Sequence, residues 1–495
     1  MVLGFMNVLA ATLFLCLTVS LIGTVVGVID LVSLLYTSPQ SFETRTTLRF
    51  TTFFLLLSII LSTIMLFLRR YTVSNIVEAF LVVAIAWIVI PTISAMAYRY
   101  SIGMDFVNAF FESLSGFTGT GLSVISKPEE MPSVILLWRA VTQWVGELGV
   151  VVFAGTLLPA LHRVIRSIYV VERGERIAPT VLSTMRRLVG IYVFYTALGV
   201  VLFILSGMSV FDALAHSMTA IATGGMSTNS LSIGYWFRGG NWAIYVSTMV
   251  IMVLGALNFV DHVALLRGRF REFVSSIEVR WFFILLTIFT IPLIALPLMR
   301  GDVDEVFTRF YHLVSGYTTT GFQLGSSDVL KNEPDYVKMI LALSMIVGGA
   351  TFSTAGGIKI KRAAILIKAL VWESARLFAP PAMVLRRRVG RELIGDTELI
   401  SVYNFVAIYM VTFISIALFI HLTLLSYGYT EFTFIDSMFE TASALSCVGL
   451  SVGITSATSP LPIKIALMIA MYLGRLEFAA LYLFLGYSYV RRVVL

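Results

Sequence analysis

Long apolar runs recur along the whole of this 495-residue chain. A helix needs about 20 apolar residues to cross a bilayer. Because lipid offers the backbone no hydrogen bonds, only helices and closed barrels can span it. The runs are continuous rather than alternating, and only 13% of the residues are charged, which favours helices in an integral membrane protein. We therefore predict an all-α polytopic chain with ten spans, near residues 5–35, 48–68, 75–98, 133–160, 184–207, 242–265, 279–299, 336–358, 398–424 and 461–490.

The basic residues give these spans an orientation. Lys and Arg are enriched in cytoplasmic loops, and an inner N-terminus places most of the 35 Lys and Arg residues on the inner side. This predicts that both termini lie in the cytoplasm, and it explains the net charge of +7 without nucleic acid; the family resemblance given below implies the cytoplasmic (plasma) membrane. The basic run RRRVGRE (386–392) is interpreted as an inner-side anchor; the alternative is a docking site for an acidic or nucleotide-binding partner.

Four shorter, half-apolar segments lie between the spans, and each is followed by a run of small residues. They align on one glycine each, in the order FESLSGFTGTGLS (Gly121), AHSMTAIATGGMS (Gly225), YHLVSGYTTTGFQ (Gly321) and FETASALSCVGLS (Gly449). Two spans separate successive segments, so all four units have the same membrane orientation. This predicts four parallel repeats of span, pore helix, loop and span around a pseudo-fourfold axis. The predicted parts are two leading helices (1–70) and repeats at 71–165, 180–268, 277–375 and 396–495.

A ring of four such loops has a chemical use. Backbone carbonyls can replace the hydration shell of a monovalent cation, and glycine reaches the unusual backbone angles that this requires. The short helices would direct their partially negative C-terminal ends toward the axis. A single Gly/Thr loop is more simply an ordinary turn, but four matched copies favour the ring.

The chain resembles the TrkH branch of the TrkH/KtrB/HKT superfamily of potassium transporters. The resemblance rests on the four loops and on TQWVGELGVVVF (142–153), LNFVDH (257–262), GGATFSTAGGIKIKR (348–362) and YLGRLEF (472–478), and it covers nearly the whole chain. It implies a channel-like subunit of a Trk-type uptake system with K⁺ at the carbonyls of the four aligned glycines. In the family, serine at the first of these glycines accompanies sodium transport, so Gly121 implies potassium selectivity.

The resemblance also implies the residues of the selectivity filter. The residues expected to bind K⁺ are Thr120, Gly121, Gly224, Gly225, Thr320, Gly321, Val448 and Gly449. The flanking residues are Gly119, Thr223, Thr319 and Cys447. Only Gly121 has a glycine counterpart in every unit, so Gly119 is interpreted as a variation of the first repeat alone.

Two charged residues fall inside apolar segments. Arg475 is costly there and is expected to face a pore or a partner. The resemblance implies a positive barrier to cations just below the filter, and the alternative is a structural salt bridge with Glu147 or Glu477. Glu147 departs from the family, which commonly has glycine in this stretch. It is expected either to pair with Arg475 or to attract cations from an inner vestibule.

The stretch GGATFSTAGGIK would break a helix in lipid. It lacks the Gly-Lys-Ser/Thr of a phosphate-binding loop. The simpler interpretation is a kinked, closely packed helix, whereas the resemblance implies an intramembrane gate beneath the filter. The gate residues would be Gly348, Gly349, Ser353, Thr354, Gly356 and Gly357.

A polar residue stands nine positions before each aligned glycine: Glu112, His216, His312 and Glu440. No cluster with metal-ligand spacing surrounds the histidines, so hydrogen-bonded anchoring of the pore helices is the preferred interpretation. Asp212 and Asp436, thirteen positions before their glycines, are expected to start helices and secondarily to attract cations.

The function expected from all of this is potassium transport, with no covalently bound cofactor. The resemblance further implies a homodimer and a TrkA-like cytosolic nucleotide-binding regulatory subunit. A sodium-permeable or cation-coupled relative remains an alternative, because coupling cannot be inferred from the loops. A membrane-embedded enzyme is disfavoured, because the sequence has no His-Glu-x-x-His motif, paired aspartates or Ser/His/Asp arrangement.

Overall fold

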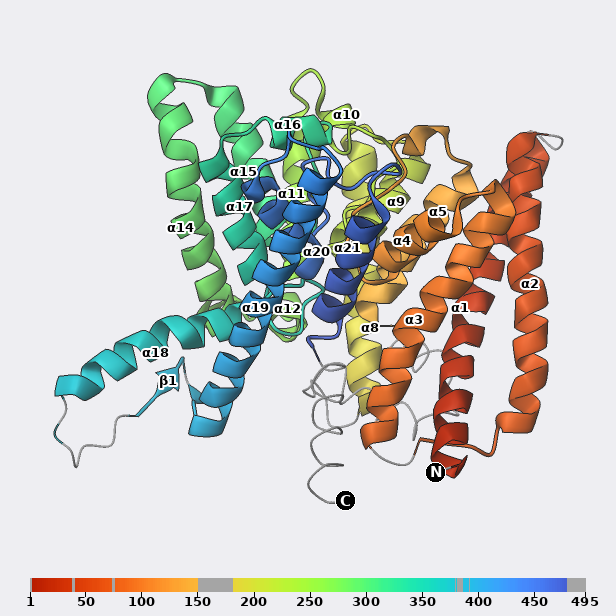
Figure 1. The fold of residues 1–495 in the computed structure, drawn as a ribbon, viewed down its shortest axis with the longest axis horizontal. Coiled ribbons are helices and arrows are strands. Elements are labelled where there is room, and N and C mark those ends of the chain that lie inside the picture. Colours follow the sequence, from red (N-terminus) through yellow and green to blue (C-terminus); the bar gives the residue numbers. More distant parts are fainter. Residues whose placement is uncertain are drawn as a thin grey trace.

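The computed structural model describes residues 2–37, 41–73, 76–149, 181–378, 380, 386–390 and 392–478. The chain begins with two long helices, α1 (Val2–Thr37) and α2 (Phe42–Leu68), which pack against each other at one end of the molecule (Figure 1). The α2 helix exposes a row of large apolar side chains that includes Leu56, Ile59 and Ile60. Exposed apolar rows of this kind face lipid rather than water.

Four groups of helices follow, and each contains one long helix and then two shorter helices. The groups are α3 (Ile76–Ile102), α4 (Phe106–Phe117) and α5 (Ser133–Leu148); α8 (Val181–Leu205), α9 (Val210–Ile221) and α11 (Trp242–Ala256); α14 (Ile277–Arg300), α15 (Val303–Tyr317) and α17 (Asp335–Val347); and α19 (Asp396–Ser426), α20 (Phe434–Leu445) and α21 (Leu461–Arg475). Short connecting helices are η1 (Pro128–Glu130), α10 (Gly234–Phe237), α13 (Phe270–Ser275) and α16 (Ser327–Lys331).

The short helices begin at polar caps. Asp105, Ser209, Asp302 and Thr433 each accept a hydrogen bond from a backbone N–H of the first turn of α4, α9, α15 and α20. Such caps satisfy backbone donors that would otherwise be lost in a membrane interior. Asp436 was predicted to start a helix, and it lies in the first turn of α20, where it completes a capping box with Thr433.

Among the described residues, six helices are long and apolar enough to cross a membrane: α1, α2, α3, α8, α14 and α19. The predicted span over 242–265 is broken, because the chain bends by 114° between α11 and α12 (Phe259–Leu266). Asn258 lies at the break, where its side chain accepts from the N–H of Val260 and caps the start of α12. The predicted span over 336–358 is also too long, because α17 ends at Val347. The spans over 133–160 and 461–490 lie partly outside the described residues.

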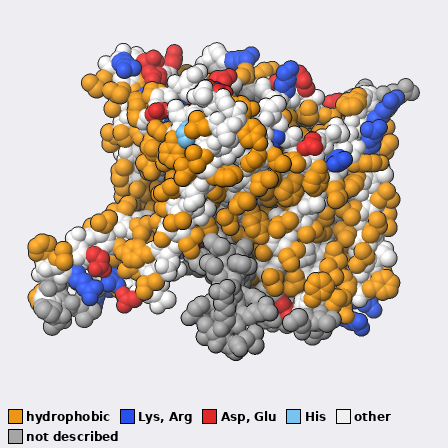
Figure 2. Space-filling model, viewed as in Figure 1, with side chains coloured by type: hydrophobic (Ala, Val, Ile, Leu, Met, Phe, Trp, Pro, Cys, Tyr) orange, Lys and Arg blue, Asp and Glu red, His pale blue; other side chains and the backbone are white. Residues whose placement is uncertain are grey.

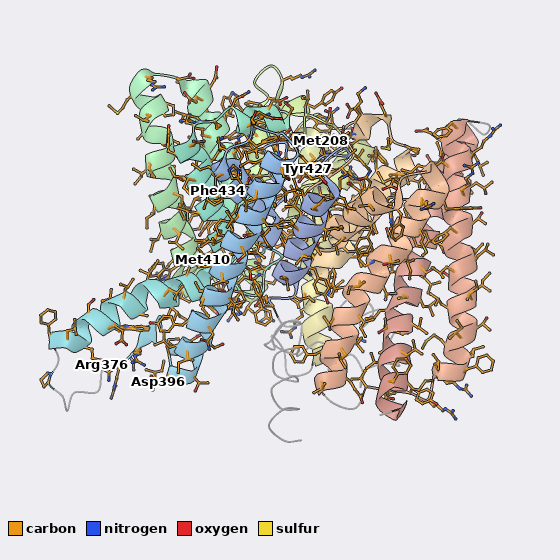
Figure 3. The ribbon with its side chains drawn as sticks, in the orientation of Figure 1. Met208, Arg376, Asp396, Met410, Tyr427 and Phe434 are labelled. Atoms are coloured by element: carbon orange, nitrogen blue, oxygen red, sulfur yellow. The ribbon has the colours of Figure 1, made fainter. Side chains whose placement is uncertain are left out.

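Charged side chains gather along the upper and lower sides of the molecule in this view, and a broad apolar band lies between them (Figure 2). The helix α19 crosses this band: Asp396 lies at its lower end, Met410 midway and Tyr427 at the upper end (Figure 3). The helix α18 (Ile360–Phe378) projects from the lower side of the bundle beside the hairpin of β1 (Arg388–Val389) and β2 (Glu392–Leu393) (Figure 1). This projecting helix was not predicted from the sequence.

Candidate functional site

The four loops that follow the short helices share one backbone conformation. In each, the residue two positions before the aligned glycine and the glycine itself have positive φ. The φ values are 70° and 80° for Gly119 and Gly121, 49° and 70° for Thr223 and Gly225, 55° and 86° for Thr319 and Gly321, and 54° and 101° for Cys447 and Gly449. The left-handed turn at Gly119 is therefore common to all four units, and only its residue type differs. Left-handed Thr and Cys are uncommon and strained.

The same pair of hydrogen bonds closes each short helix. In the first unit, the N–H of Gly119 donates to Gly116 O (3.1 Å) and the N–H of Thr120 donates to Ser115 O (3.0 Å). This is the Schellman pattern of a helix C-terminus. The second, third and fourth units repeat it at Thr223–Gly224, Thr319–Thr320 and Cys447–Val448.

The four loops meet in a closed ring. A Cβ atom added to any of the aligned glycines would lie within 2.5 Å of a backbone carbonyl oxygen in the next loop. The pairs are Gly121 with Gly224 O (2.0 Å), Gly225 with Thr320 O (1.9 Å), Gly321 with Val448 O (2.0 Å) and Gly449 with Thr120 O (2.5 Å). The contacts follow chain order, and the fourth loop closes on the first. No other residue type fits at these positions without displacing a neighbouring backbone.

The polar residue nine positions before each glycine holds the returning strand of its own loop. Glu112 accepts from the Ser123 hydroxyl (3.0 Å) and the Val124 N–H (3.0 Å). Glu440 accepts equivalently from Ser451 (2.8 Å) and Val452 (3.1 Å). The histidines bond at the same places: the Ser227 hydroxyl lies 2.9 Å from His216 Nε2, and the Leu324 N–H donates to His312 Nε2 (3.0 Å). These are anchoring contacts, as expected for the histidines.

Buried cations join neighbouring units around the ring. Arg139 pairs with Glu112 (2.7 Å) and also donates to Ser227 O in the second loop (2.9 Å). Lys338 on α17 pairs with Asp436 on α20 at 2.6 Å. Lys464 on α21 donates to the side chain of Asn108 on α4 at 2.7 Å. These three cations were not predicted from the sequence, although a charge within an apolar run was the signal that singled out Arg475.

The two aspartates near the helix starts are already engaged. Asp436 is only 2% exposed and is bonded to Lys338 and Thr433. Asp212 accepts from the hydroxyls of Thr228 (2.6 Å) and Ser209 (2.7 Å). Their geometry is that of structural groups, and nothing in it supports a role in attracting cations.

The segment Gly348–Lys359 separates α17 from α18 and lies against the ring. Thr354 donates to the backbone oxygens of Ile221 (3.0 Å) and Gly255 (2.9 Å) and accepts from the Thr223 hydroxyl (3.2 Å). The N–H of Gly356 donates to the Thr319 hydroxyl (2.8 Å). A Cβ on Gly356 would lie 1.9 Å from Ser446 O. This segment therefore contacts the flanks of the second, third and fourth loops.

Arg475 and Glu147 form an ion pair. Arg475 Nη1 lies 2.6 Å from Glu147 Oε2, and Nη2 donates to Gly146 O at 2.6 Å. The guanidinium also lies 5.0 Å from the ring centre of Trp87. Glu147 in turn lies under the first loop, because a Cβ on Gly119 would lie 1.9 Å from Glu147 Oε1. Glu477, the other expected partner, pairs with Arg362 at 2.6 Å.

In the part of the chain that the structure describes, no group of three or more His, Cys, Asp or Glu residues is arranged to hold a metal ion. The four loops offer backbone carbonyls around a closed ring. Such oxygens suit a desolvated monovalent cation.

A family model for cation transport proteins, TrkH, matches residues 47–486. The chain belongs to the TrkH family. Among TrkH relatives, an uncharacterised cation transporter of Methanocaldococcus jannaschii is 33% identical over 399 residues, or 80% of this chain and 79% of that protein. The Trk system potassium uptake protein TrkH of Escherichia coli is 31% identical over 421 residues, or 82% of this chain and 85% of that protein.

The fold agrees with a solved TrkH structure. The crystal structure of the potassium transporter TrkH from Vibrio parahaemolyticus superposes with a TM-score of 0.78 at 26% sequence identity, and the match covers 95% of this chain and 98% of that chain. The predicted family and the all-α membrane fold are thus confirmed. The chain is a multi-pass membrane protein, and its family is one of transporters rather than enzymes.

Proposed function

We propose that this chain conducts potassium ions across the cytoplasmic membrane through the ring of four loops, as the pore-forming subunit of a Trk-type uptake system. The observation that carries the proposal is the cyclic contact of the aligned glycines with carbonyl oxygens of the next loop, from Gly121 to Gly449. The proposed pore runs along the pseudo-fourfold axis of the four units, with the two leading helices at its side. The names of the relatives support potassium as the ion.

The filter is proposed to bind K⁺ through backbone oxygens. They belong to Thr120, Gly121, Gly224, Gly225, Thr320, Gly321, Val448 and Gly449, with Gly119, Thr223, Thr319 and Cys447 holding the turns. The loop N–H groups bond back to the short helices, which leaves loop carbonyls for the ion. The helix C-termini add a partial negative charge that favours a cation.

Two features are proposed to control passage. The segment with Gly348, Gly349, Ser353, Thr354, Gly356 and Gly357 is the gate, and its contacts with the flanks of three loops support this role. Arg475 is the fixed positive barrier. Its pairing with Glu147 holds the guanidinium near the first loop and offsets part of its charge.

The assembly is proposed to be a homodimer that binds a TrkA-like cytosolic regulatory subunit. Relatives named as components of a Trk system support a multi-component assembly. Both termini are proposed to be cytoplasmic, in keeping with the distribution of Lys and Arg. Arg386 and Arg388, at the start of β1, are exposed and offer a basic surface for an acidic partner.

Growth of a potassium-uptake-deficient cell at limiting potassium tests the proposal. The wild-type chain, expressed with its regulator, should restore growth. Gly121→Ser should lose discrimination of potassium from sodium, because its added atoms meet Gly224 O in the ring. Gly103→Ser is the matched control: Gly103 also has positive φ (70°), but nothing lies within 4 Å of its added Cβ.

Failure of a well-expressed wild type to restore growth would count against potassium transport. Growth with equal uptake of sodium and potassium would favour the sodium-permeable alternative. Equal loss in Gly103→Ser and Gly121→Ser would show that backbone strain, and not the ring contact, causes the effect.

A further inference from the structure

The second loop differs from the other three in how its central carbonyl is held. The position just before the aligned glycine is Thr120, Thr320 or Val448 in the other loops, but Gly224 here. Gln143 of α5 fills the space: a Cβ on Gly224 would lie 2.5 Å from Gln143 Cδ. The extra glycine of the second loop therefore admits a side chain from the preceding unit.

Gln143 bonds to this loop through both ends of its amide. Its Nε2 donates to Gly224 O at 2.6 Å, and its Oε1 accepts from the Met226 N–H at 3.0 Å. A carbonyl accepts only and a backbone N–H donates only, so the orientation of the amide is fixed. The side chain is fully buried and spans the glycine at 225.

The carbonyl that Gln143 binds is one of the four that form the ring. Gly224 O is the oxygen that faces Gly121, as Thr320 O faces Gly225. Within the described residues, the equivalent oxygens of Thr120, Thr320 and Val448 accept no hydrogen bond, whereas Gly224 O accepts one from Gln143. Of these four carbonyl oxygens, that of Gly224 is thus the one that accepts a hydrogen bond from a side chain of the described residues.

We infer that Gln143 is a specificity-determining positioning residue, which weakens and fixes the Gly224 carbonyl so that the ring favours the larger cation. A hydrogen bond from the amide N–H of Gln143 draws electron density from the carbonyl oxygen of Gly224 and places a partial positive charge near it. Oxygens of lower field strength discriminate less in favour of small, strongly hydrated Na⁺. The inference rests on the proposed function of the ring as a filter.

The equivalent positions in other units indicate which residue should replace Gln143 in a test. Gly146, Gly255 and Gly474 each pack against the carbonyl of the residue four positions before a ring glycine. In this register, Met252 and Met471 occupy the position of Gln143 in the second and fourth units. Gln143→Met therefore installs a side chain that the fold already accepts there, of similar length and without a donor.

The test is the potassium-to-sodium permeability ratio of the full chain in liposomes, from reversal potentials under K⁺ and Na⁺ gradients. Gln143→Met should lower the ratio by about threefold or more. Gln143→Glu should lower it too, because a carboxylate accepts from Met226 but cannot donate to Gly224 O. Met252→Leu, which removes no donor, should leave it unchanged. A wild-type ratio in both Gln143 variants overturns the inference.

If the variants do not fold, a measurement on the wild type tests whether Gln143 alters how the Gly224 carbonyl binds an ion. In crystals soaked in Rb⁺, the anomalous peak at the ring should lie farther from Gly224 O than from the oxygens of Thr120, Thr320 and Val448. Equal distances overturn the inference and leave the filter standing. Absence of Rb⁺ from the ring overturns both the inference and the proposed function. A conducting but unselective wild type overturns the inference and counts against the selectivity of the ring, but it leaves cation conduction standing.

Discussion

Glu147 and Arg475 occupy the same position in two different units, at equal separation from Gly121 and Gly449, and they bond to each other at 2.6 Å. Because the fourth loop closes on the first, these equivalent positions are neighbours. The fold thus pairs opposite charges across the junction where the ring closes. The second and third units have no such charge there: Ala256 follows Gly255 as Glu147 follows Gly146, and Val347 has the same separation from Gly321.

The two partners of this pair should have opposite effects on cation flux when each is removed alone. Arg475→Ala removes the positive charge and should raise flux severalfold. Glu147→Gln removes the negative charge that is bonded to the arginine and should lower flux, because a less compensated positive charge repels cations more strongly. Flux per reconstituted molecule in liposomes measures both. A rise in both variants would show that the pair acts as a latch and not as an electrostatic barrier.

Gly119 and Glu147 should depend on each other. A methyl group at Gly119 would overlap the Glu147 carboxylate, so Gly119→Ala should destabilise the protein by about 1–3 kcal/mol. Gly239→Ala is the control, since Gly239 has φ 76° and open space around its added Cβ. In the background of Glu147→Gly, the cost of Gly119→Ala should fall toward that of the control. Thermal unfolding in detergent measures the coupling, and additive effects would contradict it.

A covalent link between the gate segment and the ring should stop conduction. The hydroxyls of Thr223 and Thr354 lie 3.2 Å apart, so cysteines at both positions are expected to form a disulfide on oxidation. Flux should fall under oxidant and return under reductant. The single variants are controls for pairing with the native Cys16 and Cys447, which are buried and free. Full flux in a completely oxidised sample would argue against a gate that moves.

The Lys338–Asp436 pair should contribute strongly to stability. Both side chains are at most 5% exposed, and removing one partner of a buried pair costs about 3–5 kcal/mol. Asp436→Asn should therefore lower the melting temperature clearly, and adding Lys338→Met should recover part of the loss. Glu130→Gln is the comparison, because its pair with Lys127 is exposed (64% and 60%) and worth about 0–1 kcal/mol. Equal effects at the two sites would contradict this ranking.

The repeat was readable from the sequence because it recurs at matching positions. Glycines 121, 225, 321 and 449 and the polar residues before them were aligned correctly, and the ring brings those glycines together. The break within GGATFSTAGGIK was likewise predicted, because two pairs of glycines inside an apolar run destabilise a continuous helix.

Other features depend on contacts that no local pattern encodes. The bend near Asn258 interrupts an apolar run, and it coincides with a side-chain cap at the start of α12. Lys338 meets Asp436 and Lys464 meets Asn108 only because neighbouring units pack together. The left-handed turn at Gly119 was hidden because three different residue types adopt it in the four loops.

The closure of Gly449 on Thr120 has a consequence for how the protein is made. The first loop of the ring is synthesised early, but the fourth loop, which lies beside it, belongs to the last unit of the chain. Lys464, which bonds to Asn108, is translated later still. A chain that stops short of its final unit therefore lacks the loop that closes the ring between Gly321 and Thr120.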